Sequence, residues 1–290
     1  MLRAIIYKMN KAALFLFIIV CLSFASAFAE NEQVTALAVS IASYLDGRVR
    51  TGGENSAQGV ADALEKSVET KYSTTLLLDP TRDELLSAIA DVLEASEGSR
   101  KLFYINCHAL SIDGAAALET SDLGAVTALE LEAALRKVPG HITVIIDCCY
   151  SGAFIGASEF GDRFLSETLN AFSGGGQNAF ALSKYSVLAS CSAGQRSYRV
   201  ADGGLDEENV ATVFSRALCE ALGWDLINDR MTSLKADFNG DRRVTLNEAY
   251  LYITQRSGYY LSAANVNQSV QLYPSGCGLQ LASRARSVYE

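Results

Sequence analysis

The chain has 290 residues, of which 49% are hydrophobic and 20% are charged, and its formal net charge is −9. This is the composition of an ordinary globular protein with enough apolar material for one core. The negative charge and the lack of a basic run argue against a protein that binds nucleic acid.

The start of the chain is typical of an export signal. A positive segment that includes Lys8 precedes the apolar run 12–27, and Ala29 ends a small-x-small cleavage site. A retained anchor helix is the alternative, but the apolar run is shorter than the ~20 residues that a membrane span requires. We therefore expect a signal peptide over residues 1–29, a single domain over residues 30–290, and a periplasmic or extracellular protein.

Apolar runs and helical stripes then alternate along the chain. The runs predict strands over residues 36–41, 74–78, 102–105, 142–146 and 185–189. Apolar spacing predicts helices over residues 57–68, 81–93, 129–137, 213–222 and 246–253. Thr81 and Thr127 are expected to cap two of these helices, and Asp113-Gly114 is expected to form a turn. This alternation predicts a parallel sheet covered by helices.

Two of the predicted strands end in residues that can carry chemistry. His108 follows the strand 102–105, and Cys149 follows the strand 142–146, with one crossover between them. A crossover of this length makes the two strands parallel neighbours, so that their ends lie side by side. Open α/β sheets keep their active sites at this edge. The imidazole could take the thiol proton, and the thiolate could attack a carbonyl carbon.

Competing candidates are limited. The chain has two histidines, and His141 stands at the entry of its strand, at the opposite edge of the sheet. Neighbouring side chains of a strand point to opposite faces, so only one of Cys148 and Cys149 can face His108. We expect Cys149 to be free, and Cys191, Cys219 and Cys277 to be small buried residues.

These residues resemble the caspase-like (clan CD) cysteine peptidases, and most of all the metacaspase and clostripain branches. The resemblance rests on His108 at one strand end and on the run Asp-Cys-Cys-Tyr-Ser-Gly at residues 147–152. It implies an α/β/α sandwich with a mostly parallel central sheet flanked by helices, and an endopeptidase in which Cys149 is the nucleophile and His108 the base. The backbone N–H groups of Ala109 and Cys149 would bind the oxyanion, although the family usually has Gly where Ala109 stands.

Asp147 lies on the same face as Cys149 by the two-residue period of a strand. The family uses an Asp at this position to bind a basic P1 residue, which implies cleavage after Arg or Lys; a solvated Asp at the strand end is the alternative. A second pocket acid of the family is replaced here by Asn55-Ser56. Ser190 and Ser192, in the loop after strand 185–189, are expected to line the substrate pocket.

Residues 237–248 resemble a calcium-binding EF-hand loop. Arg242 occupies the position where the loop's sharp turn favours Gly. Calcium binding and a plain turn that caps the following helix both remain open. The ligands would be the side chains of Asp237, Asn239, Asp241, Thr245 and Glu248 and the carbonyl of Arg243.

A glycine-rich segment at residues 172–178 is a candidate processing loop. Arg163 and Lys184 flank it and fit a basic P1 preference. A surface loop without a processing role is the alternative.

The sequence therefore predicts an exported cysteine endopeptidase that acts on polypeptides and requires no cofactor, with calcium as an open addition. A monomer is favoured, and the oligomeric state is otherwise open. The sequence predicts no nucleic-acid partner, and no membrane partner after the signal is removed. Two alternatives remain: a catalytically inactive caspase-like module that binds peptides or partners, and a calcium-binding interaction protein.

Overall fold

The computed structural model describes residues 32–50, 53–112, 115–154, 184–199 and 211–285. Three predicted features lie outside these residues: the signal peptide 1–29, the turn at Asp113-Gly114, and the glycine-rich segment 172–178 together with Arg163. The folded unit begins at Gln33.

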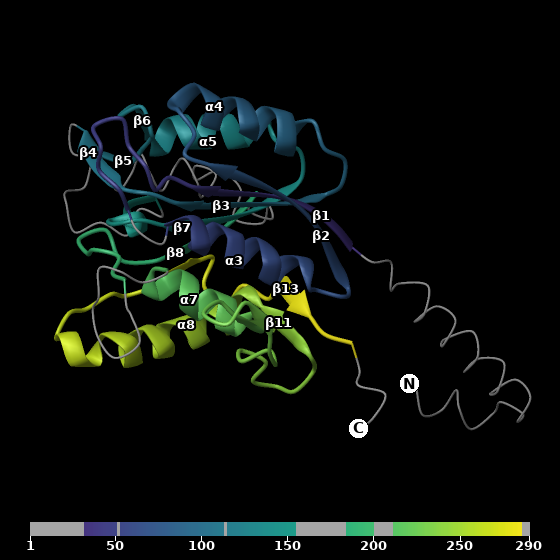
Figure 1. The fold of residues 1–290 in the computed structure, drawn as a ribbon. Helices are drawn as coiled ribbons and strands as arrows, with labels where there is room; N and C mark the ends of the chain where they lie inside the picture. Colours follow the sequence, from purple (N-terminus) through teal and green to yellow (C-terminus); the bar gives the residue numbers. More distant parts are fainter. Residues whose placement is uncertain (1–31, 51–52, 113–114, 155–183, 200–210, 286–290) are drawn as a thin grey trace, which may run out of the picture. The chain divides into compact units, whose positions relative to one another are not determined.

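A six-stranded sheet forms the centre of this unit, with the order β12-β8-β7-β3-β1-β2 (Figure 1). Its strands are β1 (Glu32–Ser40), β2 (Thr70–Leu78), β3 (Arg100–Asn106), β7 (His141–Asp147), β8 (Tyr185–Ala189) and β12 (Gln271–Tyr273). Strands β1, β3, β7 and β8 are mutually parallel, and β12 runs antiparallel to β8. The predicted, mostly parallel sheet is confirmed.

Helices α4 (Arg82–Ala88) and α5 (Ala128–Lys137) cover one face of the sheet, and α4 continues as the π-helix η1 (Ile89–Glu94). The predicted caps are confirmed: Thr81 and Thr127 each form a capping box, in which the hydroxyl accepts the N–H of a glutamate three residues on and that glutamate accepts the cap's N–H. Each box thereby satisfies two backbone donors at a helix start.

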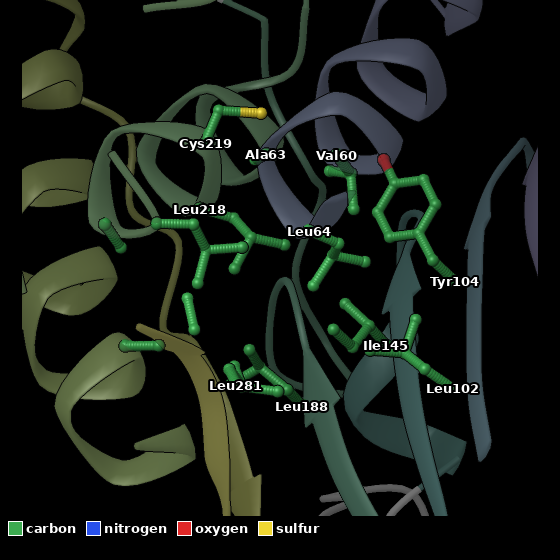
Figure 2. Close-up of a cluster of buried hydrophobic side chains, with 14 of the residues drawn as sticks. Val60, Ala63, Leu64, Leu102, Tyr104, Ile145, Leu188, Leu218, Cys219 and Leu281 are labelled. Atoms are coloured by element: carbon green, nitrogen blue, oxygen red, sulfur yellow. The ribbon is translucent and has the colours of Figure 1, made fainter. Parts of the chain in front are cut away.

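Helices α3 (Gly53–Glu65), α7 (Val213–Ala221) and α8 (Leu246–Leu261) cover the other face. Strand side chains alternate between the two faces, so Leu102 and Tyr104 pack here while Phe103 and Ile105 pack under α4 and α5. Figure 2 shows Leu64 of α3 and Leu218 of α7 beside Leu102 in this core. Helix α8 is longer than predicted, because Ser257 and Leu261 continue its buried stripe beyond residue 253.

Three small sheets complete the described residues. Strands β4 (Ala109–Ile112), β5 (Ala115–Glu119) and β6 (Ala125–Thr127) form an antiparallel sheet directly after β3. The pairs β9 (Trp224–Asp225) with β10 (Arg230–Met231), and β11 (Arg243–Thr245) with β13 (Gln280–Ser283), lie in the second half of the chain. Short 3₁₀ turns follow Cys149 as η2 (Ser151–Phe154) and follow α8 as η3 (Ser262–Ala264). Among the helices of the described ranges, none combines the length and apolarity needed to cross a membrane.

Candidate active site

The register of β3 and β7 places His108 and Cys149 at matching positions. Asn106 pairs with Asp147 at the carboxyl ends of the two strands, and each candidate residue follows its paired residue by two positions. The N–H of Cys107 extends the pairing by donating to the carbonyl of Asp147 at 3.4 Å. The strand order thus brings the two predicted catalytic residues to one edge, while His141 is the first residue of β7, at the other edge.

Burial separates the two adjacent thiols. Cys148 is fully buried, and its pKa is raised well above the ordinary value by a hydrogen bond with Cys107 and by burial. Cys149 is partly exposed, and its Sγ lies 3.9 Å from the carbonyl oxygen of Ser197. Of these two thiols, Cys149 alone meets the first requirement of a nucleophile, which is access to a substrate. All six cysteines of the described ranges are unpaired in the structure, as expected for Cys149.

Ser151 and Gly152 connect the turn that holds Cys149 to the residues that follow β8. The hydroxyl of Ser151 accepts the N–H of Cys191 at 3.0 Å and lies 3.1 Å from the hydroxyl of Ser190. A Cβ at Gly152 would lie 2.7 Å from the backbone nitrogen of Ala193, so only glycine allows this close approach. The pair therefore fixes the distance between the nucleophile's turn and the loop that follows β8.

His108 is held as a neutral imidazole. Its pKa is lowered to about 4, mainly by burial and next by the positive charge of Arg50. Arg48 and Arg199 act in the same direction, whereas Glu119 opposes them. A neutral imidazole at neutral pH can accept a proton, which is what a general base must do.

The N–H of Ala109 points away from its neighbouring strand. Ala109 faces Leu118 in the antiparallel pair β4–β5, and the adjacent hydrogen bond runs from the N–H of Glu119 to the carbonyl of His108. This pattern makes Ala109 and Leu118 a non-hydrogen-bonded pair, whose N–H groups face outward. Strand β4 is also the edge of its three-stranded sheet. The orientation is compatible with the predicted oxyanion donor, and the change from Gly to Ala leaves the N–H in place.

The carboxylate of Asp147 is fully buried in a network of donors. Its Oδ1 accepts the hydroxyl of Ser197 at 2.9 Å, and its Oδ2 accepts the side-chain amide of Asn106 at 2.8 Å. The hydroxyls of Thr212 and Ser215 also donate to Oδ2, the latter at 2.5 Å. These contacts compensate the buried charge. They argue against the predicted direct contact between Asp147 and a basic substrate residue, because the carboxylate presents no surface to an incoming cation.

The two predicted pocket serines differ in position. Ser190 is fully buried; its hydroxyl donates to the carbonyl of Cys148 at 3.1 Å, and its carbonyl accepts the amide of Gln268 at 2.9 Å. It supports the nucleophile's turn and does not reach the surface as a pocket residue would. Ser192 is partly exposed, and its N–H donates to the side chain of Gln195 at 3.3 Å.

Several residues of the site were not predicted from sequence. Arg50 is only 5% exposed, and its guanidinium donates to the side chain of Asn106, 56 positions further along the chain. Tyr44 contacts His108, with 5.2 Å between the ring centroids. These contacts join the loop after β1 to the end of β3, and no local spacing marks partners so far apart in sequence.

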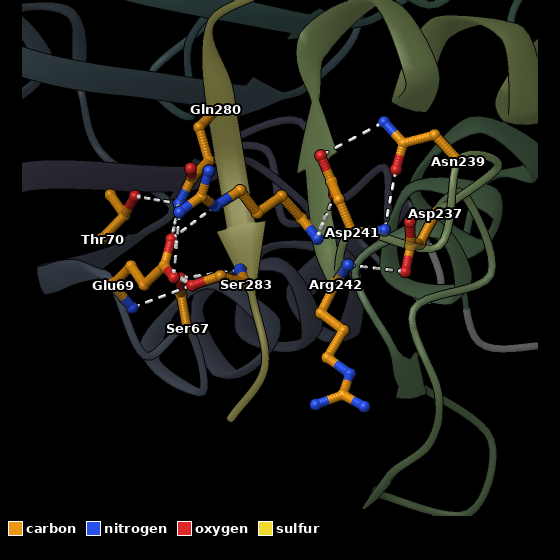
Figure 3. Close-up of polar contacts among 10 residues, drawn as sticks. Ser67, Glu69, Thr70, Asp237, Asn239, Asp241, Arg242, Gln280 and Ser283 are labelled. Atoms are coloured by element: carbon orange, nitrogen blue, oxygen red, sulfur yellow. Dashed lines mark hydrogen bonds and ion pairs between the residues drawn. The ribbon is translucent and has the colours of Figure 1, made fainter. Parts of the chain in front are cut away.

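The predicted calcium loop is folded on its own hydrogen bonds (Figure 3). Asp237 accepts the N–H groups of Gly240 and Arg242, each at 2.9 Å. Arg242 has a φ of 67°, the left-handed conformation for which the loop favours Gly. Glu248 accepts the N–H and the hydroxyl of Thr245 in the capping box of α8. Within the described ranges, no three His, Cys, Asp or Glu side chains gather closely enough to hold a metal ion.

Other predicted ligand and processing residues also have partners. Asn239 accepts the N–H of Asp241, and Asp241 accepts the N–H of Arg243, each at 2.8 Å. The side chain of Arg243, whose carbonyl was the predicted ligand, forms an ion pair with Glu69 at 2.7 Å. Lys184 donates to the carbonyl of Val138 at 2.6 Å and to that of Arg136, at the end of α5. Its ammonium group is thereby held against the body of the fold.

Comparisons with known proteins agree with this architecture. The family model described as the caspase domain matches residues 33–259. No curated protein sequence matches the chain significantly.

Three solved structures share the fold at low sequence identity. A protein from Geobacter sulfurreducens is 16% identical, with a TM-score of 0.54 and coverage of 86% of this chain and 97% of that one. Caspase-1 from Spodoptera frugiperda is 14% identical, with a TM-score of 0.55 and coverage of 87% and 90%. The Drosophila initiator caspase Dronc is 14% identical, with a TM-score of 0.53 and coverage of 86% and 82%. At these identities the likeness establishes the fold alone.

Proposed function

The chain belongs to the caspase-domain family, whose members are cysteine peptidases, and from this premise we propose that it is an endopeptidase with Cys149 as nucleophile and His108 as general base. A peptidase domain implies a polypeptide substrate. Membership of the metacaspase or clostripain branch stays a prediction.

One observation carries the proposal. Strands β3 and β7 are parallel neighbours, and Asn106 at the end of β3 pairs with Asp147 at the end of β7. The neutral imidazole of His108 and the partly exposed thiol of Cys149 each follow two residues later. Several hydrogen bonds stabilise this arrangement, including the one from the N–H of Cys191 to the hydroxyl of Ser151 in the turn after Cys149. A base beside an accessible thiol is the minimal arrangement for nucleophilic thiol catalysis.

The proposed reaction has two stages, acylation of Cys149 and hydrolysis of the thioester. His108 takes the proton of the Cys149 thiol as the sulfur attacks the carbonyl carbon of the scissile bond. The intermediate then collapses, the carbon–nitrogen bond breaks, and the leaving amine takes the proton from His108. A water molecule, deprotonated by His108, attacks the resulting thioester and releases the acid product and the thiol. The N–H groups of Ala109 and Cys149 would stabilise the oxyanion of each tetrahedral intermediate.

The charged groups near His108 do not by themselves select a P1 residue. Arg48, Arg50 and Arg199 lower the pKa of the imidazole, and Glu119 raises it. Asp147, on which the predicted preference for Arg or Lys rests, is buried and occupied by its own donors. Arg50 is also buried and donates to Asn106, and Arg48 is paired with Asp46 and Glu119, so neither guanidinium is free for a P1 carboxylate. The proposal is therefore a cysteine endopeptidase, and cleavage after Arg or Lys stays a prediction for the experiment to decide.

A small fluorogenic panel tests both the proposal and this prediction. The substrates carry Asp, Asn, Arg, Lys or Ala at P1, and the enzymes are the protein without residues 1–29, its Cys149→Ala variant, and Cys277→Ala as a matched control. We expect cleavage of at least one substrate that Cys149→Ala abolishes and Cys277→Ala retains. Cleavage after Arg or Lys would in addition support the role predicted for Asp147, and cleavage after Asp alone would keep the dyad and rule that role out.

The inactive binding module is the competing function. It predicts no hydrolysis of any panel member, and a Cys149 thiol that reacts with iodoacetamide no faster than Cys277. Both thiols are partly exposed, so accessibility alone does not favour one of them. Fast alkylation of Cys149 that is lost in His108→Asn would count against the module, because it requires an activated thiol.

A further inference from the structure

We propose that Tyr44, Arg48 and Glu119 form, with His108, a closed positioning ring that holds the imidazole of the catalytic base in place. This inference rests on the proposed function, since it assigns the ring to the base of that reaction. The three residues belong to the loop after β1 and to the end of β5, and Figure 1 shows β4 and β5 beside the strand ends of the sheet.

The first side of the ring joins Tyr44 to His108. The backbone N–H of His108 donates to the hydroxyl of Tyr44 at 3.0 Å, across 64 positions of sequence. The two rings are tilted by 33°, with 5.2 Å between their centroids. The Tyr44 hydroxyl in turn lies 3.3 Å from the carbonyl of Ile41 and donates to it. Tyr44 is 5% exposed, so packing fixes its phenol group, and this group in turn limits the motion of the imidazole.

The second side joins Arg48 to Tyr44 and Glu119. The guanidinium of Arg48 lies over the Tyr44 ring, 5.0 Å from its centroid. Two parallel hydrogen bonds, of 2.6 and 3.1 Å, connect it to the two carboxylate oxygens of Glu119. Asp46 holds the same guanidinium from the loop at 2.6 Å. A bidentate pair of this kind fixes direction as well as distance.

Glu119 closes the ring through its backbone. Its N–H donates to the carbonyl of His108 at 2.9 Å, so both backbone polar groups of His108 are held by members of the ring. The Glu119 side chain is only 6% exposed, and a carboxylate buried to this extent requires a partner such as Arg48. The positioning ring thus connects the buried carboxylate of Glu119 and the packed side chain of Tyr44 to the backbone of His108.

The two charges of the ring act on His108 in opposite directions. Arg48 lowers the pKa of His108 and Glu119 raises it, while Arg50 and Arg199 lower it from outside the ring. The other titratable groups at these strand ends are Tyr44, Cys107, Asp147, Cys148 and Cys149. Removing Arg48 should therefore raise the pKa of His108, and removing Glu119 should lower it. Removal of an ion pair remote from His108 would leave the pKa of His108 unchanged.

Proton NMR of the Cys149→Ala protein tests the ring without any need for hydrolysis. The chain has two histidines, so His108→Asn identifies the His108 signal. We expect Arg48→Met to raise and Glu119→Gln to lower the pKa of His108, and Arg230→Met, which removes an exposed guanidinium, to leave it unchanged. Shifts in the same direction, or no shift, would overturn the proposal.

Kinetics provide the second arm if the protein hydrolyses peptides. Tyr44→Phe removes the hydroxyl that accepts the His108 N–H and donates to the Ile41 carbonyl, but it keeps the aromatic ring. Arg48→Lys keeps the positive charge but cannot form the two parallel hydrogen bonds to Glu119. We expect each to lower kcat by about tenfold with little change in KM, at an unchanged melting profile. Unchanged kcat in both variants would refute the positioning role. If the wild type hydrolyses nothing, the NMR shifts still decide on the ring, and the proposed function fails separately.

Discussion

At the scale of single residues, burial and backbone contacts decide which side chains can take part in chemistry. Cys148 and Cys149 are adjacent in sequence, yet Cys148 is fully buried and Cys149 is partly exposed. Asp147 is one position further back and is also buried, with both oxygens accepting hydrogen bonds. The alternation of a strand places two residues on opposite faces, but whether a face is open depends on what packs against it.

The buried, neutral state of His108 predicts a pH dependence of stability. Its pKa is lowered from 6.5 to about 4 in the folded protein. The unfolded chain therefore binds this proton at higher pH than the folded protein does. The free energy of unfolding should therefore fall as the pH drops from 6.5 towards 4.

Urea unfolding at several pH values checks this prediction. The variant His108→Asn should show a shallower loss of stability over that range than the wild type, while His141→Asn, the matched control, should keep the wild-type slope. Equal slopes for the wild type and His108→Asn would contradict a lowered pKa. In an active enzyme, the acid limb of kcat/KM should also lie near pH 4.

At the scale of secondary structure, turns and caps that look like functional motifs are first of all devices that satisfy the backbone. The loop at residues 237–248 has the acidic spacing of a calcium site, but its carboxylates accept the loop's own N–H groups, and Glu248 completes a capping box with Thr245. Calcium binding by this loop stays a prediction. What the structure shows is a loop that is internally hydrogen-bonded.

This internal bonding predicts that the loop keeps its fold without calcium. We expect EDTA to leave the melting temperature unchanged, because the N–H groups that need acceptors already have them. Calorimetric scans with EDTA and with millimolar calcium measure this directly. A lower melting temperature in EDTA, absent in the variant Asp241→Asn, would instead identify calcium as part of the folded state.

At the scale of the whole molecule, the strand order β7-β3-β1 brings together residues that are distant in sequence. The end of β3 carries His108, the end of β7 carries Cys149, and the loop after β1 adds Tyr44, Arg48 and Arg50. Parallel strands share one carboxyl edge, so the topology gathers these three segments into one site.

Export is a prediction about the whole chain. Residues 1–29 have the pattern of a cleaved signal, so the full-length gene product should be recovered outside the inner membrane with Glu30 as its first residue. Intact-mass measurement of the exported protein tests this. Replacing Ala29 by Trp should leave the precursor uncut, whereas Ser23→Thr, within the apolar run, should be processed normally. Recovery of a full-length chain in the cytosol would refute export.

The sequence by itself determined the order of the main strands and helices, the caps Thr81 and Thr127, the mostly parallel sheet, and the adjacent parallel strands that His108 and Cys149 follow. These features follow from local periodicity, cap chemistry and the geometry of a crossover, which depend on neighbours in the chain. Only the tertiary structure decided that Asp147 is buried, that Arg50 meets Asn106, and that Tyr44, Arg48 and Glu119 surround His108. The partners in these contacts lie tens of residues apart, and burial depends on every element packed around a site, so no local pattern encodes them.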